Sequence, residues 1–93
     1  MYEIRFYRKA KEYLSKISPE ERKFILKEIY KLKQNPYSHS RLKPLKGYKK
    51  LWKLYIKENR AIIKIIIIKR IALVLTIGHR RDVYGKFFDK GKK

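Results

Sequence analysis

Apolar and polar residues alternate through the second half of the chain, a pattern that predicts three consecutive β-strands. The expected strands span residues 51–57, 60–68 and 71–77. The apolar face of the first two strands is expected to hold Trp52, Leu54, Ile56, Ala61, Ile63, Ile65 and Ile67. Side chains alternate across a strand, so the opposite face takes a polar or aromatic set: Lys53, Tyr55, Arg60 and Lys64.

The first half of the chain changes from a strand pattern to a helical one. Residues 2–7 alternate and predict a short strand, whereas residues 8–17 place apolar side chains at helical spacing. A second helix is expected from Ser18 to about residue 34. Ser18 can cap it, Pro19 suits its first turn, and Glu21 is placed to complete a capping box. Both helices are interpreted as scaffold for the sheet.

Two further segments lack a clear period. Residues 36–47 predict a loop in which Arg41, Lys43 and Lys46 are available to phosphate groups, and His39 is expected as a surface histidine without a catalytic role. After the last strand, residues 82–88 predict a short turn or helix, and a basic tail follows over residues 86–93.

Length and composition limit the classes of protein that fit. Ninety-three residues predict one domain, spanning residues 1–93. The sequence has no cysteine, which excludes disulfides and thiolate metal sites, and its two histidines do not suggest zinc. Lysines and arginine interrupt the isoleucine-rich run before it reaches the ~18 apolar residues of a membrane helix. We therefore expect a soluble, cytoplasmic protein that needs no metal and no cofactor and binds no membrane.

The net charge of +19 is the strongest compositional signal. Residues 1–40 contain 10 basic and 5 acidic side chains, whereas residues 41–93 contain 17 basic and 3 acidic ones. A lysine-rich surface of the thermophilic kind normally gains acids alongside bases, and this chain does not. The imbalance predicts a polyanionic partner for the second half of the chain, with nucleic acid as the first candidate.

Three stretches together resemble the RelE/ParE superfamily of toxins from toxin–antitoxin systems. They are LKPLKG, LWKLYIKENRAIIKI and VLTIGHRRDVY, and the order of the expected elements follows the superfamily over the whole chain. The resemblance implies an α+β fold with the order β-α-α-β-β-β. In that fold a small, twisted and mainly antiparallel sheet carries two helices on one face.

The resemblance also implies a function and its partners. RelE-type members are messenger-RNA interferases: ribosome-dependent endonucleases that cut mRNA in the ribosomal A site. The partners implied are a cognate, RelB-like antitoxin, the mRNA and ribosomal RNA. Two alternatives stay open at this point. ParE-type members share the fold but poison DNA gyrase without catalysis, and a basic RNA-binding module without catalysis would also explain the charge.

Matching the superfamily motif residue by residue implies a set of catalytic positions. They are Lys53 on the first strand of the sheet, Arg60 at the start of the next, Arg80 after the last, and Tyr84. This sequence departs from the pattern at Tyr55, where some RelE members carry a second lysine. His79, which precedes Arg80, resembles the histidine-using branches, so either Lys53 or His79 is expected to be the general base.

The chemistry of RNA cleavage fits these residue types. Without a metal, the 2′-hydroxyl must lose a proton, attack the phosphorus and expel the 5′-oxygen. Arginines stabilise the phosphorane charge, His79 changes charge near neutral pH, and Tyr84 can stack on a base. The remaining basic residues are expected to bind RNA or the ribosome: Arg41, Lys43, Lys46, Lys49, Lys50, Lys64 and Arg81.

Overall fold

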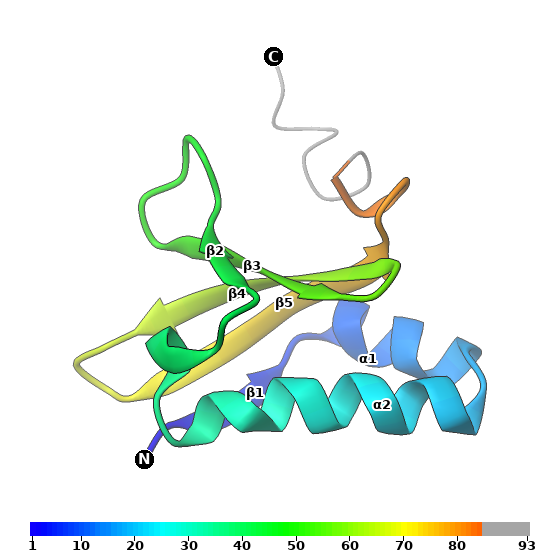
Figure 1. The fold of residues 1–93 in the computed structure, drawn as a ribbon, viewed down its shortest axis with the longest axis horizontal. Helices are drawn as coiled ribbons and strands as arrows, with labels where there is room; N and C mark the ends of the chain where they lie inside the picture. The colour runs from blue at the N-terminus through cyan, green and yellow to red at the C-terminus, as the bar shows by residue number, and fades with distance from the viewer. Residues whose placement is uncertain (85–93) are drawn as a thin grey trace.

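The structure is a computed structural model that describes residues 1–84. Two helices lie beneath a five-stranded sheet (Figure 1). The elements are β1 (Glu3–Phe6), α1 (Arg8–Lys16), α2 (Pro19–Tyr30), the 3-10 turns η1 (Lys31–Lys33) and η2 (Pro36–Ser38), β2 (Leu42–Pro44), β3 (Leu51–Ile56), β4 (Asn59–Ile66) and β5 (Ile71–His79). The basic tail and most of the turn expected over residues 82–88 lie outside the described residues.

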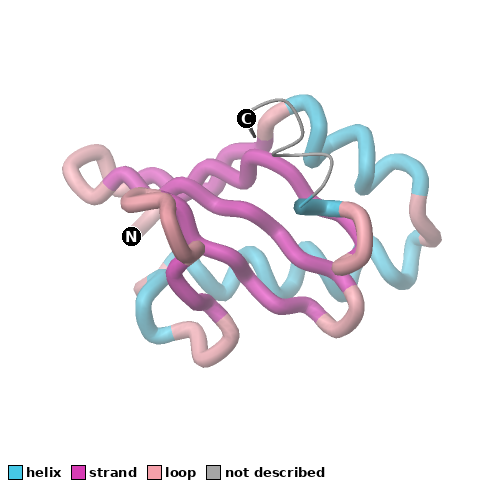
Figure 2. Tube along the Cα trace, turned by 90° about the horizontal axis from the view of Figure 1, so that it is seen from above, coloured by secondary structure: helices cyan, strands magenta, loops and turns pink. Residues whose placement is uncertain are grey.

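The sheet has the strand order β1-β5-β4-β3-β2. β1 pairs with β5 in parallel, and the other neighbours are antiparallel. Figure 2 shows the sheet in front of the helices, which cover only the far face. The predicted α+β architecture, with two helices on one face of a mainly antiparallel sheet, is therefore confirmed. We call the face away from the helices the open face.

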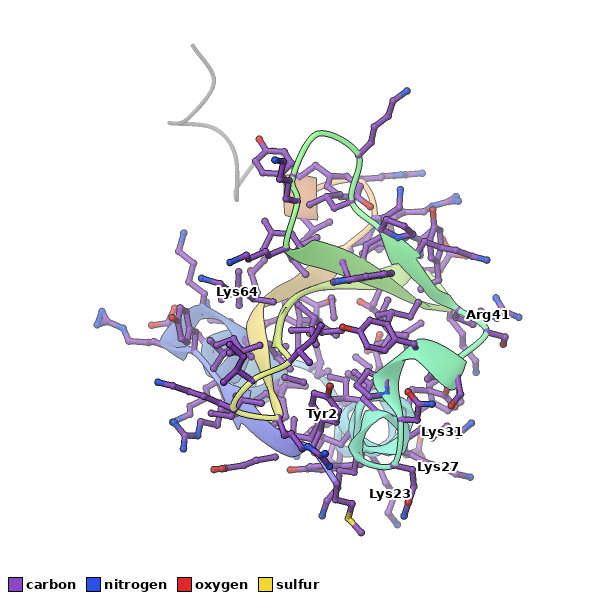
Figure 3. The ribbon with its side chains drawn as sticks, turned by 90° about the vertical axis from the view of Figure 1, so that its left-hand side faces the viewer. Tyr2, Lys23, Lys27, Lys31, Arg41 and Lys64 are labelled. Atoms are coloured by element: carbon purple, nitrogen blue, oxygen red, sulfur yellow. The ribbon has the colours of Figure 1, made fainter. Side chains whose placement is uncertain are left out.

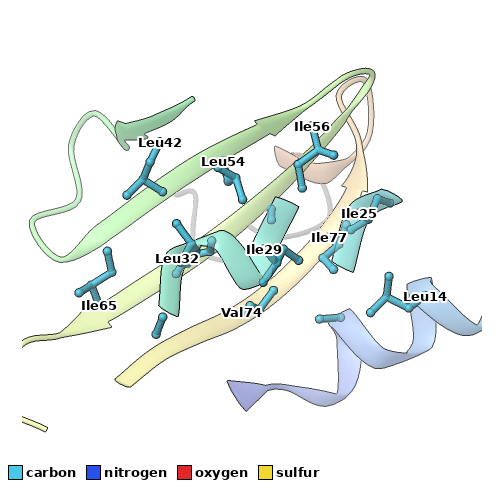
Figure 4. Packing of buried hydrophobic residues seen from close by; sticks show 14 residues of the cluster. Leu14, Ile25, Ile29, Leu32, Leu42, Leu54, Ile56, Ile65, Val74 and Ile77 are labelled. Atoms are coloured by element: carbon cyan, nitrogen blue, oxygen red, sulfur yellow. The ribbon is translucent and has the colours of Figure 1, made fainter. Parts of the chain in front are cut away.

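The main hydrophobic core lies between the sheet and the two helices (Figure 4). Ile25 and Ile29 of α2 are fully buried against the apolar face of the strands, where Leu54 and Val74 are also fully buried. These residues follow the helical and strand periods expected from the sequence, so the predicted core is confirmed. Its outer edge is completed by half-buried aromatic side chains, including Trp52.

Two parts of the sheet differ from the predicted pattern. The segment expected as a loop contains β2, because Leu42 is buried opposite Leu54 and three residues are too short to show a period. The second long strand ends at Ile66 instead of residue 68. Ile67 therefore leaves the apolar face and is 63% exposed in the turn before β5.

A β-bulge changes the register between β4 and β5. Ile62 pairs with Thr76, whereas the next residue, Ile63, pairs with Val74. The extra residue explains why Val74 and Ile77, three positions apart, both belong to the helix-side core. Beyond the bulge β5 continues to His79, two residues farther than the alternation predicts.

The start of α2 agrees only in part with the expected capping box. The Ser18 side chain accepts a hydrogen bond from the Glu21 amide at 3.1 Å, and Pro19 occupies the first turn. The Glu21 carboxylate instead accepts from the Asn59 side-chain amide at 3.3 Å. Asn59 also accepts from the Tyr13 hydroxyl, so a buried polar residue is satisfied from both helices.

The expectation of a surface position for His39 is wrong. Its side chain is only 6% exposed, and Nε2 lies 3.2 Å from Oε1 of Glu28 on α2. Burial alone raises the pKa of Glu28, but hydrogen bonds and charges from Lys31 and His39 outweigh it and hold the pKa below its ordinary value. His39 therefore attaches the segment before β2 to the helix layer. Within residues 1–84, neither helix has the length and apolarity to span a membrane.

Candidate active site

The strand register places two of the predicted catalytic residues, Lys53 and Arg60, on the open face. Lys53 of β3 stands opposite Lys43 of β2, and Tyr55 of β3 stands opposite Arg60 of β4. Directly paired side chains of an antiparallel sheet project from the same face. Two lysines placed opposite each other repel and destabilise the sheet, so this pair needs a reason other than folding.

Aromatic rings hold the cations of this face close together. The Arg60 guanidinium carbon lies 4.2 Å from the centre of the Tyr55 ring. Lys53 Nζ lies 5.4 Å from the same ring and 5.8 Å from the ring of Tyr84. We call Lys53, Tyr55, Arg60 and Tyr84 the open-face cluster. Its two basic side chains contact ring faces, and among residues 1–84 they form no ion pair with a carboxylate.

Arg60 and Arg80 are both fixed by the turn between β3 and β4. Arg60 Nη1 donates to the carbonyls of Lys57 and Asn59, each at 2.8 Å. The Arg80 amide donates to the Glu58 carbonyl at 2.8 Å, and Arg80 Nε lies 3.0 Å from the Glu58 carboxylate. The Glu58 ion pair is more than half exposed on both sides, so a phosphate group can compete with it.

A small second core on the open face supports Tyr84. Leu45, Ile62 and Val83 form it, and Tyr84 packs against it at the edge. Gly78 makes this possible, because a Cβ there would lie 3.2 Å from Cβ of Val83. The glycine lets the segment after β5 fold down onto the strand and place Tyr84 beside Lys53.

His79 is not brought together with the open-face cluster. It pairs with Asn59, whose side chain contacts the helices, so the register places His79 on the helix side of the sheet. Its Nδ1 accepts a hydrogen bond from the Arg81 amide at 3.1 Å. The half-buried ring thus helps to shape the turn that carries Arg80.

The basic residues expected to bind RNA separate into two groups. Arg41, Lys43, Lys46 and Arg81 are exposed on β2 or on the segments that border the open face. The other three, Lys49, Lys50 and Lys64, line a hollow at the end of the sheet where β4 turns into β5. Lys64 also lies on the open face, diagonally across from Lys53, because Lys53 pairs with Ile62, two residues before Lys64.

No role was predicted from the sequence for Tyr55 or Gly78. Tyr55 has a signal, since a tyrosine between Lys53 and Arg60 on one face can contact both. Gly78 had none, because its close approach to Val83 depends on how the segment after β5 folds back. In the described part of the chain, no group of three or more histidine or acidic side chains is arranged to hold a metal ion.

The sequence matches no protein-family model and no curated protein. Solved structures do match the fold. The RelE–RelB complex of Pyrococcus horikoshii covers 88% of this chain and 98% of its own matched chain, with a TM-score of 0.75 and 14% identity. The match to the RelBE2 toxin–antitoxin complex of Mycobacterium tuberculosis covers 85% of this chain and 98% of the matched chain, with a TM-score of 0.74 and 21% identity.

The isolated RelE toxin of E. coli covers 97% of this chain and 98% of its own, with a TM-score of 0.73 and 20% identity. The structural similarity spans nearly all of each matched chain. Sequence identities of this size, however, establish only that the fold is shared. The chain therefore has the RelE toxin fold, as the sequence resemblance predicts.

Proposed function

We propose that this protein is the toxin of a toxin–antitoxin system and cleaves messenger RNA on the ribosome. The observation that carries the proposal is the open-face cluster, in which the Tyr55 ring contacts both Lys53 and Arg60 and the Tyr84 ring contacts Lys53. The solved RelE structures with the same fold include complexes with antitoxins, which supports an antitoxin partner for this chain. The net charge of +19 supports an RNA substrate.

The arrangement of the cluster fits cleavage by the 2′-hydroxyl of the message. Lys53, as the free amine, takes the proton from the 2′-hydroxyl, and the new O2′–phosphorus bond forms as the bond to the 5′-oxygen breaks. Arg60 and Arg80 stabilise the negative charge of the phosphorane. Water protonates the departing 5′-oxygen. The products are a 2′,3′-cyclic phosphate and a 5′-hydroxyl.

Lys53 fits the role of general base better than His79. Its amine lies on the open face between two aromatic rings, where an RNA base can also stack. His79 lies on the helix side, and its Nδ1 is occupied by the Arg81 amide. A rate that continues to rise above neutral pH supports Lys53, whereas a rate that levels off near neutral pH supports His79.

The proposal is tested by adding the purified protein to a translating extract and mapping the message ends by primer extension. We expect new ends within translated codons, and none on the same message when ribosomes are omitted. The cut fragments are expected to carry a 5′-hydroxyl, which polynucleotide kinase can label directly. Added chelator, in a reaction whose ribosomes are kept intact by polyamines, is expected to leave the cut unchanged.

Three results would contradict the proposal. A 5′-phosphate product would exclude attack by the 2′-hydroxyl. A cut that stops when Mg²⁺ is removed from intact ribosomes would show that Lys53, Arg60 and Arg80 do not suffice. Inhibition of DNA supercoiling by gyrase without any RNA cut would assign the protein to the ParE-type mode of action.

A further inference from the structure

A hollow of about 490 Å³ opens at the end of the sheet where β4 turns into β5. Figure 3 shows the molecule from this end, with Lys64 on one side and the lysines of α2 on the other. The lining of the hollow is largely apolar. The ring centroids of Trp52 and Tyr37 lie 5.3 Å apart in an edge-to-face arrangement, and Ile67 and Ile68 also line the hollow. Ile68 is 93% exposed and Ile67 is 63% exposed.

Exposed isoleucines at this position do not serve the fold. The strand has ended at Ile66, and the next two residues contribute nothing to the main core. Two adjacent apolar residues that stay mostly exposed in a turn cost solubility and gain little burial. A partner that covers them would recover apolar contact that the isolated chain does not make.

The charge around the hollow indicates what kind of partner fits. Lys49, Lys50 and Lys64 line it, and none of the nine described residues that line it is acidic. Nucleic acid would satisfy the lysines but offers no close match for the isoleucines, because RNA is recognised through phosphates and stacked bases. A polypeptide with both acidic and apolar side chains satisfies the two features together.

We propose that this hollow is a docking site for an acidic protein segment whose apolar side chains cover Ile67, Ile68 and Trp52. Lys49, Lys50 and Lys64 pair with the acidic residues of that segment and do not contact the message. The two isoleucines lie far from Arg60, since Arg60 and Ile66 stand six residues apart on β4, roughly 20 Å along the strand. Docking here therefore does not depend on the proposed cleavage.

The test uses the full chain and three short synthetic peptides labelled with fluorescein. The first has leucines on one helical face and glutamates on the other. The second has glutamine in place of each glutamate, and the third has serine in place of each leucine. Trp52 is the only tryptophan of the chain, so its emission reports directly on the hollow. A uridine oligonucleotide serves as the nucleic-acid probe.

We expect only the leucine–glutamate peptide to bind tightly and to shift the emission of Trp52. The double substitution Ile67→Ser/Ile68→Ser is expected to weaken this peptide about tenfold, to leave the oligonucleotide unchanged and to leave message cleavage unchanged. Both isoleucines are exposed, so the variant keeps the fold. Lys49→Glu/Lys64→Glu is expected to weaken the peptide more than Lys23→Glu/Lys27→Glu, which changes the net charge equally on α2.

Either of two results would overturn the inference. If the serine peptide binds as tightly as the leucine peptide, charge alone explains the binding and the hollow is not a docking site. If the isoleucine variant loses the oligonucleotide, the hollow binds RNA. Message cleavage by the parent protein is scored in a separate assay, so its absence would refute the proposed function and leave this inference standing.

Discussion

The two faces of the sheet use the same strands for different purposes. On the helix side, a continuous apolar core surrounds one buried polar residue, Asn59, which Tyr13 and Glu21 satisfy. Within residues 1–84, the open face has the small core of Leu45, Ile62 and Val83, with Leu51, Leu75 and Tyr84 packed against it, and it also carries Lys53, Tyr55 and Arg60. Alternation along β3 and β4 keeps the two sets apart, because neighbouring residues project to opposite faces.

This difference assigns stability to the helix side and leaves the open face for the proposed chemistry. The helix side is a continuous apolar core. The open face, in contrast, places Lys43 directly opposite Lys53, and the repulsion between the two charges destabilises the sheet. Departures from folding rules are expected where a protein binds or reacts. Substitutions on the helix side should therefore change stability, and substitutions on the open face should change activity.

Ile29→Ala should give the largest effect on stability. Ile29 is fully buried between α2 and the sheet, and truncating such a side chain costs roughly 2 to 5 kcal/mol of unfolding free energy. Chemical denaturation followed by circular dichroism measures the loss. The matched control is Tyr30→Ala on the same helix, where the side chain is 45% exposed and a much smaller change is expected. Equal losses at the two positions would contradict the assignment of the core.

Gly78→Ala should destabilise the open face without disturbing the helix side. The added methyl group lies 3.2 Å from Cβ of Val83, and overpacking of this kind costs about 1 to 3 kcal/mol. The double variant Gly78→Ala/Val83→Gly removes the Cβ of residue 83 that the new methyl group would press on, so it should be less destabilised than the sum of the two single variants. Strict additivity in denaturation would show that the two residues do not press on each other.

Tyr55→Leu should lower the rate of message cleavage several-fold, with little change in stability. Its ring contacts both Lys53 and Arg60, and a cation–π contact at a partly exposed site contributes about 0.5 to 1 kcal/mol. Tyr55→Phe keeps the ring and should retain the parent rate. If the leucine variant cleaves as fast as the phenylalanine variant, the ring does not position the cations.

The smallest predicted effect is on the unfolding free energy at acidic pH. The pKa of Glu28 is held below 4.5, because hydrogen bonds and charges from Lys31 and His39 outweigh the effect of burial. A lowered pKa in the folded state stabilises the protein fully above pH 4.5, and this contribution is lost as the pH falls through the lower value. Glu28→Gln should flatten that part of the profile, whereas Glu12→Gln, at an exposed ion pair, should not.

The elements predicted correctly from the sequence are those in which a periodic pattern of apolar residues continues over many positions. The stripe of Ile25 and Ile29 and the alternation of β3 and β4 were sufficient for the two-layer arrangement, and the same alternation placed Lys53, Tyr55 and Arg60 on one face. β2 was missed because three residues show no period, and the burial of His39 was missed because its partner Glu28 lies in another element.

The geometry of the site depends on contacts that cross between elements. The ion pair of Glu58 with Arg80 joins two turns that are far apart in the sequence. The bulge between Ile62 and Ile63 changes which residues of β5 face the helices. No local pattern specifies either feature, and the position of His79 on the helix side follows from the register beyond the bulge.

The proposed role of Lys53 as the general base on the open face is tested most directly by one measurement. Single-turnover cleavage of a ribosome-bound message is compared for the parent, Lys53→Ala and Lys23→Ala, after circular dichroism shows that all three are folded. Removing the general base should slow cleavage by about 10²- to 10⁴-fold, whereas the exposed Lys23 on α2 should leave the rate unchanged. A Lys53→Ala variant that cleaves at the parent rate would contradict the account.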